Sequence, residues 1–93
     1  MERQGFDNVW DALEATPEQA ANMSMRSELL IAIGQQIRSW NLTQVEAARR
    51  LGVTQPRLND LLRGRINNFS LDTLVDLARQ AGLSVRIDIG KAA

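Results

Sequence analysis

Amide and guanidinium side chains recur at short intervals between residues 55 and 65, and both types can recognise flat, polar ligands. The amides of Gln55 and Asn59 each combine a donor with an acceptor, which is the pair of groups on the exposed edge of adenine. The guanidinium of Arg57 presents parallel N–H donors that match the two acceptors of guanine. Each such match is worth about 1–3 kcal/mol of discrimination between bases. On one helix face, these side chains would read nucleic-acid bases.

The first element that must position them is a short helix, which we predict to begin after Thr43 and to end at Gly52. The Thr43 hydroxyl can accept a hydrogen bond from the first turn, and Glu46 can reach back to Thr43, which makes a capping box. Gly52 can take a positive φ without steric cost, as a tight turn between two helices requires. The apolar stripe of this helix is predicted to be Val45, Ala48 and Leu51.

A second short helix is predicted to follow, with Thr54 as its N-cap and Gly64 as its stop. Pro56 lies in its first turn, where the missing amide hydrogen had no partner in any case. Its inner stripe is predicted to be Leu58, Leu61 and Leu62. Two capped helices joined by a glycine turn have the layout of a helix-turn-helix, whose second helix enters the major groove of DNA.

This layout gives each polar side chain an expected role. Gln55 and Arg57, near the start of the second helix, are predicted to read bases. Gln44 lies at the start of the first helix, where free amides favour a phosphate. Arg63 and Arg65 are predicted to hold the DNA backbone. The full set of candidate DNA-binding residues is Thr43, Gln44, Thr54, Gln55, Pro56, Arg57, Asn59, Asp60, Arg63 and Arg65.

The same residues allow a simpler interpretation. Arginines are common on solvated helix faces, and Arg57 could pair with Asp60 three residues later. An acid facing DNA would be repelled by phosphate, so Asp60 would either orient Arg57 or accept a hydrogen bond from a cytosine amine.

The motifs resemble those of the Cro/C1-type (XRE) helix-turn-helix family. The matching motifs are Leu42-Thr43-Gln44, Ala47-Ala48, Leu51-Gly52-Val53-Thr54-Gln55 and Leu61-Leu62-Arg63-Gly64. The similarity continues to Gly82-Leu83 and covers roughly residues 25 to 89. Within the family, Gln55-Pro56-Arg57 and the segment Phe69-Ser70-Leu71-Asp72-Thr73-Leu74 look most like antitoxins of the HigA type.

The resemblance implies an all-α, five-helix domain that represses transcription from double-stranded DNA. It further implies the antitoxin of a toxin–antitoxin pair, which autoregulates its operon and neutralises an mRNA-cutting toxin. The alternative is a stand-alone regulator of the same family with no toxin partner.

The composition argues against several other classes of function. The chain has 93 residues, without cysteine or histidine, which removes thiol nucleophiles, imidazole bases and the usual zinc ligands. No glycine-rich phosphate loop or Gly-x-Ser-x-Gly turn is present. We therefore expect no enzyme, no cofactor and no metal. The N-terminus is polar and no apolar run is long enough for a membrane, so we expect a cytoplasmic protein.

The net charge is zero, but the charges are separated along the chain. Residues 41–68 carry five arginines against two acids, a net charge of +3, whereas residues 1–30 carry six acids against two arginines, a net charge of −4. A basic surface for phosphate and an acidic surface for another partner would explain this split. Acids that cluster early in helices to suit the helix dipole would explain it equally well.

Residues 1–23 are predicted to form an acidic, helical N-terminal extension, and residues 24–82 the helix-turn-helix domain. Three helical pieces precede the turn motif: one near Phe6 to Leu13, one starting at the Thr16 capping box, and one from about Ser24 to Trp40. Trp10 in the first piece either packs on its own domain or anchors a basic partner protein.

After the second helix of the motif, Ser70 is predicted to cap another helix that runs to Ala81. Residues 83–93 then form a predicted C-terminal strand and tail, because apolar side chains alternate with polar ones there. The candidate dimerisation residues are Leu83, Val85, Ile87 and Ile89. A strand needs a ladder partner, so we expect the same strand of a second subunit, in a homodimer on a palindromic operator. The alternatives are packing of this tail on its own helices, or pairing with an edge strand of a toxin.

Overall fold

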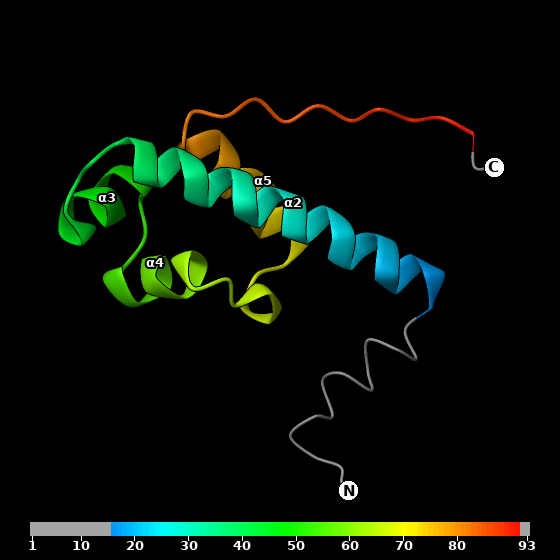
Figure 1. Cartoon of the computed structure of the whole chain (residues 1–93), viewed down its shortest axis with the longest axis horizontal. Helices are drawn as coiled ribbons and strands as arrows, with labels where there is room; N and C mark the ends of the chain where they lie inside the picture. Colours follow the sequence, from blue (N-terminus) through cyan, green and yellow to red (C-terminus); the bar gives the residue numbers. More distant parts are fainter. Residues whose placement is uncertain (1–15, 92–93) are drawn as a thin grey trace, which may run out of the picture.

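The computed structural model describes residues 16–91, which form four α-helices and one short 3₁₀ helix (Figure 1). In chain order these are α2 (Pro17–Ser39), α3 (Gln44–Leu51), α4 (Gln55–Leu62), η1 (Ile66–Asn68) and α5 (Leu71–Gln80). The long helix α2 packs along α5. Helices α3 and α4 pack against each other beside the C-terminal half of α2. The expected all-α domain is therefore present.

Helix α2 begins with the predicted capping box. The Thr16 hydroxyl accepts a hydrogen bond from the Gln19 amide at 3.1 Å, and the Gln19 side chain accepts one from the Thr16 amide at 3.0 Å. The helix then continues for 23 residues without a break, so the prediction of separate pieces starting at Thr16 and Ser24 is wrong. Neither glycine nor proline lies between Pro17 and Gly34, and alanine, methionine and glutamate favour a continuous helix. The piece predicted near Phe6 to Leu13 lies outside the described residues.

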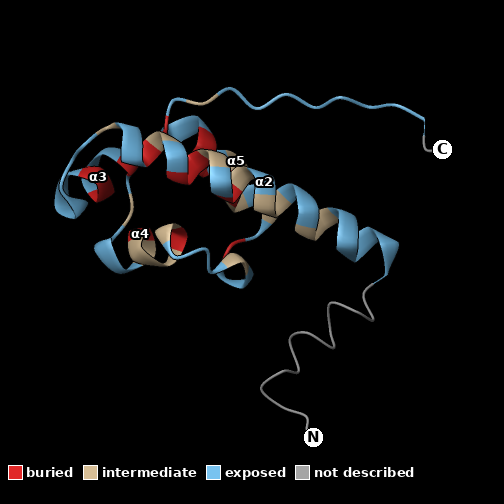
Figure 2. Ribbon diagram, viewed as in Figure 1, coloured by how far each residue is buried: buried red, intermediate tan, exposed pale blue. Residues whose placement is uncertain are grey.

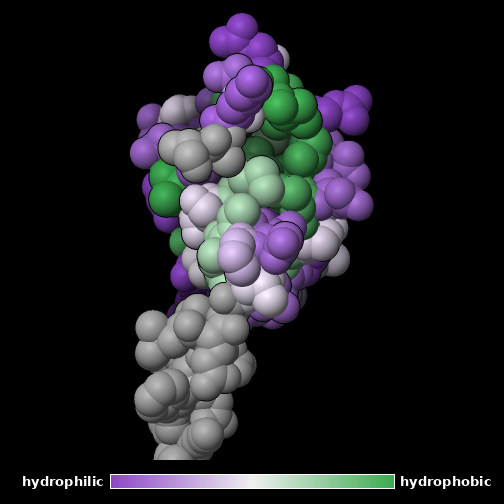
Figure 3. Space-filling view, turned by 90° about the vertical axis from the view of Figure 1, so that its right-hand side faces the viewer, coloured by the Kyte–Doolittle hydropathy of each residue, from purple (hydrophilic) through white to green (hydrophobic). Residues whose placement is uncertain are grey.

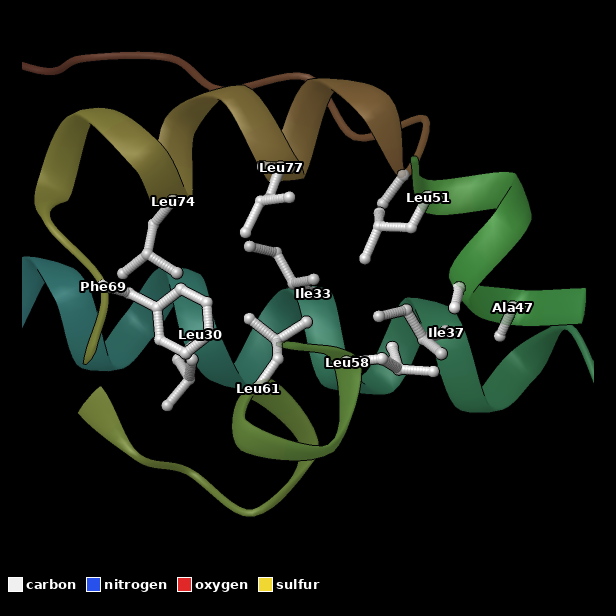
Figure 4. Packing of buried hydrophobic residues seen from close by; sticks show 13 residues of the cluster. Leu30, Ile33, Ile37, Ala47, Leu51, Leu58, Leu61, Phe69, Leu74 and Leu77 are labelled. Carbon is white, nitrogen blue, oxygen red and sulfur yellow. The ribbon is translucent and has the colours of Figure 1, made fainter. Parts of the chain in front are cut away.

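One hydrophobic core lies between the helices (Figure 2). Figure 4 shows side chains of α2, α4 and α5 pointing toward one another, with Phe69 in the same cluster. The most deeply buried side chains are those of Ile33, Leu51, Leu58, Phe69 and Leu74. This core fixes α4 against α2 and α5, so the opposite face of α4 is turned toward solvent.

The predicted inner stripe of the first motif helix is only partly right. Ala48 and Leu51 are buried, but Val45 is 50% exposed and Ala47 is buried in its place. Ala47, Ala48 and Leu51 share one helix face, and Val45 lies well to the side of it at 100° per residue.

The C-terminal segment, residues 83–91, leaves the body of the molecule as an extended chain without regular secondary structure. We expected five α-helices and a terminal strand, but residues 16–91 contain four α-helices and no strand. The short helix η1 lies in the connection between α4 and α5. A strand requires a neighbouring strand for its backbone hydrogen bonds, and nothing else in the described part of this single chain is extended in that way.

Candidate nucleic-acid interface

The turn between α3 and α4 has the geometry that the sequence predicts. The Thr43 hydroxyl accepts from the Glu46 amide at 3.2 Å, and the Glu46 carboxylate accepts from the Thr43 amide at 3.1 Å. Gly52 has φ of 81°, in the left-handed region, and its amide donates to the Ala48 carbonyl at 2.8 Å. This conformation suits glycine and ends α3 in one residue.

Helix α4 is held by its inner side and capped at its start. The Thr54 hydroxyl accepts from the Arg57 amide at 3.2 Å, and Pro56 lies in the first turn as predicted. Leu58 and Leu61 are buried, whereas Leu62 is only partly buried against the core. The exposed N-terminal turn of α4 is thus presented on a rigid support.

The structure leaves several of the candidate residues free to meet a ligand. Thr43 and Gln44 are exposed at the start of α3, and Thr54, Gln55 and Pro56 are exposed at the start of α4. Arg63 and Arg65 are exposed after α4, although Arg65 also lies beside the Asp60 carboxylate, and Asn59 is half-buried. Amide and guanidinium groups are types of side chain that can hydrogen-bond to base edges and phosphates.

Arg57 is placed differently from a free base reader. Its guanidinium carbon lies 4.1 Å from the centre of the Phe69 ring, and its Nη1 donates to the Asn68 carbonyl at 2.9 Å. The side chain therefore fastens α4 to the loop that leads into α5. To reach a guanine, the guanidinium would have to leave these two contacts.

Asp60 takes part in the same network, but not through Arg57. One carboxylate oxygen lies 3.6 Å from Arg65 Nε, and the other accepts from the Asn68 side-chain amide at 3.3 Å. The ion pair with Arg65 replaces the pairing with Arg57 that the three-residue spacing allowed. It also offsets the acid's charge on a surface where an isolated carboxylate would repel phosphate.

Sequence reasoning did not identify the partners that fix this loop. Arg26 of α2 donates from Nη1 to the carbonyls of Ile66 at 3.2 Å and Phe69 at 3.3 Å. Arg26 and Arg57 thus hold the loop from two different helices. The sequence separation from Arg26 to these carbonyls is at least 40 residues, so no local pattern could have indicated the contacts.

Other kinds of site find no support in the part of the chain that the structure describes. Residues 16–91 contain no group of three or more metal-ligating His, Cys, Asp or Glu side chains. None of the helices in this range is both long and apolar enough to cross a membrane.

Comparison with known families decides the class of this α3–turn–α4 unit. A family model described as a helix-turn-helix domain matches residues 13–90, which is most of the chain. The chain belongs to this helix-turn-helix family. Membership indicates a DNA-binding regulator and agrees with the fold. No curated protein matches the chain.

Proposed function

We propose that this helix-turn-helix protein is a transcriptional repressor that binds a palindromic DNA operator as a homodimer. The observation that carries the proposal is the exposed, capped N-terminal turn of α4, held by buried Leu58 and Leu61 and preceded by the Gly52 turn. A helix presented in this way enters the major groove with its first residues at the base edges. Such a repressor acts where the DNA is, which we take to be the cytoplasm, and we assign it no catalytic activity.

Energetic considerations favour Gln55 as the main base reader. Its side chain is exposed, so pairing with adenine costs no internal contact. Arg57 would gain about 1–3 kcal/mol from guanine but would give up a charged hydrogen bond worth about 1.5–3 kcal/mol. The two terms offset each other, so Arg57 contributes less net specificity than its type alone suggests. Asn59, which is half-buried, is assigned the same adenine chemistry as Gln55.

The remaining candidates are assigned to the DNA backbone. Gln44 and Thr54 lie at helix starts, where free amides favour phosphate, and Arg63 and Arg65 are exposed cations that follow α4. Thr43 and Pro56 set the helix starts that present these groups.

Selection of binding sites from a random duplex library tests this proposal. The wild type should select half-sites that are centred about 34–36 Å apart, one turn of DNA. Gln55→Ala should lose preference at one base pair of each half-site, whereas Arg65→Ala should weaken binding to all duplexes alike. Selection of no sequence by the wild type would refute the proposal. A Gln55→Ala variant with an unchanged preference would remove Gln55 as reader.

We further propose that the repressor is the antitoxin of a toxin–antitoxin pair that neutralises an mRNA-cutting toxin. The support is the similarity of Gln55-Pro56-Arg57 and of residues 69–74 to HigA-type antitoxins, together with the exposed apolar side chains of Met25 and Ile31 on α2, outside the α3–turn–α4 unit. Induction of the short reading frame beside the gene should kill cells, and co-expression of this chain should rescue them. Absence of killing would leave a stand-alone regulator.

A further inference from the structure

The C-terminal segment, residues 83–91, is anchored at one end and exposed along the rest. The Leu83 amide donates to the Ala78 carbonyl at 2.9 Å, and its side chain packs against the core. Beyond it, Val85, Ile87 and Ile89 are 36%, 84% and 88% exposed. Figure 3 looks at the end of the molecule toward which this segment extends, and hydrophobic surface gathers in the upper part of that view. An extended chain with such side chains and no ladder partner among residues 16–91 is built to pair with another strand.

A second copy of this segment restricts how the two strands can pair. In an antiparallel pair, directly opposed residues point to the same face of the ribbon. The apolar residues occupy odd positions and Arg86 and Asp88 occupy even ones. If odd positions of one strand faced even positions of the other, isoleucine side chains would lie opposite charged ones. Odd positions must therefore face odd positions, and this happens only when one residue lies on the two-fold axis, opposite its own copy.

The charges of Arg86 and Asp88 distinguish the remaining registers. With Arg86 on the axis, two arginines face each other, and with Asp88 on the axis, two aspartates do so; both arrangements are destabilising. With Ile87 on the axis, each Arg86 faces Asp88 of the partner subunit, and the apolar face contains both copies of Val85, Ile87 and Ile89. With residue 85 or residue 89 on the axis, one of the three apolar residues Val85, Ile87 and Ile89 has no residue of the partner's segment opposite it.

We propose that two copies of this chain pair their C-terminal segments as antiparallel strands centred on Ile87, held in register by reciprocal Arg86–Asp88 ion pairs. This inference rests on the homodimer of the proposed function and specifies its interface. The segment is extended but unpaired in the single chain because its ladder partner belongs to the second copy.

Cysteine cross-linking tests the register directly, because the natural chain has no cysteine. Ile87→Cys should form a disulfide-linked dimer on mild oxidation, since facing residues lie about 4.5–5.5 Å apart between Cα atoms, within disulfide range. In the matched control Ile89→Cys, the two cysteines are offset by four residues, about 14 Å, and should not cross-link. Efficient cross-linking at position 89 rather than 87 would overturn the register.

Charge exchange tests the ion pairs. Arg86→Asp and Asp88→Arg should each weaken self-association about tenfold or more, because both cross-strand pairs become like-charged. An equimolar mixture of the two variants should restore dimer of wild-type affinity, since every opposed pair is then complementary. If the mixture stays as weak as the single variants, the assignment is wrong.

Sedimentation equilibrium of the wild type separates this inference from the proposal on which it rests. A monomer at tens of micromolar would overturn both the homodimer and the register. A dimer that binds DNA but does not cross-link through Ile87→Cys would overturn the register alone.

Discussion

Replacement of Arg57 by alanine should lower the stability of the fold, because this side chain connects α4 to the loop before α5. The variant loses the hydrogen bond to the Asn68 carbonyl and the contact with the Phe69 ring. A charged hydrogen bond is worth about 1.5–3 kcal/mol, and partial exposure favours the lower end. A cation–π contact at an exposed site adds about 0.5–1 kcal/mol. The expected loss is about 2 kcal/mol, a substantial part of the roughly 5–14 kcal/mol that stabilises a chain of this length.

Urea denaturation followed by far-UV circular dichroism measures this loss, and a thermal scan should show a Tm lowered by about 8–16 °C. Arg63→Ala is the matched control, because Arg63 is an exposed arginine directly after α4 and its side chain forms no hydrogen bond or ion pair with another residue of the described range. It should change stability by no more than about 0.5 kcal/mol. Equal effects of the two substitutions would refute a structural role for Arg57.

Three further predictions follow from the same structure. Gly52→Ala should cost about 1–2 kcal/mol in urea denaturation because of its φ of 81°, whereas Gly90→Ala, which meets no atom within 4 Å and has no positive φ, should cost almost nothing. Leu58→Ala should destabilise by about 2–5 kcal/mol, since the side chain is fully buried; an unchanged urea midpoint would contradict the core described above. Arg65→Ala should reduce the salt dependence of DNA binding by a slope of about 0.9, measured by fluorescence anisotropy against salt, and an unchanged slope would exclude a phosphate contact.

The helix starts and the turn were predictable because they depend on local chemistry. Thr43 and Thr54 accept hydrogen bonds from amides three residues away, and Gly52 ends α3 by its own backbone conformation. Such features need no knowledge of distant contacts. For this reason the sequence predicted the α3–turn–α4 unit and the exposed start of α4.

The features that the sequence did not predict depend on contacts between distant residues. Spacing suggested Asp60 as the partner of Arg57, but the structure brings Arg57 to Phe69 and the Asn68 carbonyl, and Asp60 to Arg65. Ser24 suggests a new helix start from sequence alone, although a continuous helix tolerates a serine on an exposed face. These choices follow from packing and not from residue type.

The C-terminal segment differs from the predicted strand for another reason. Its alternation predicts a strand, but a ladder needs a second strand that the described part of one chain does not contain. The pairing therefore remains a prediction about two copies, and the cross-linking at Ile87 addresses it.

The proposed function requires that α4 enter the DNA with its N-terminal turn foremost. Titration of ¹⁵N-labelled protein with the selected operator duplex tests it most directly, with a scrambled duplex of equal length as control. We expect the largest operator-specific amide shifts at residues 54–59 of α4, with smaller shifts at the start of α3. Operator-specific shifts confined to α2 or to residues 83–91, with α4 unchanged, would contradict it.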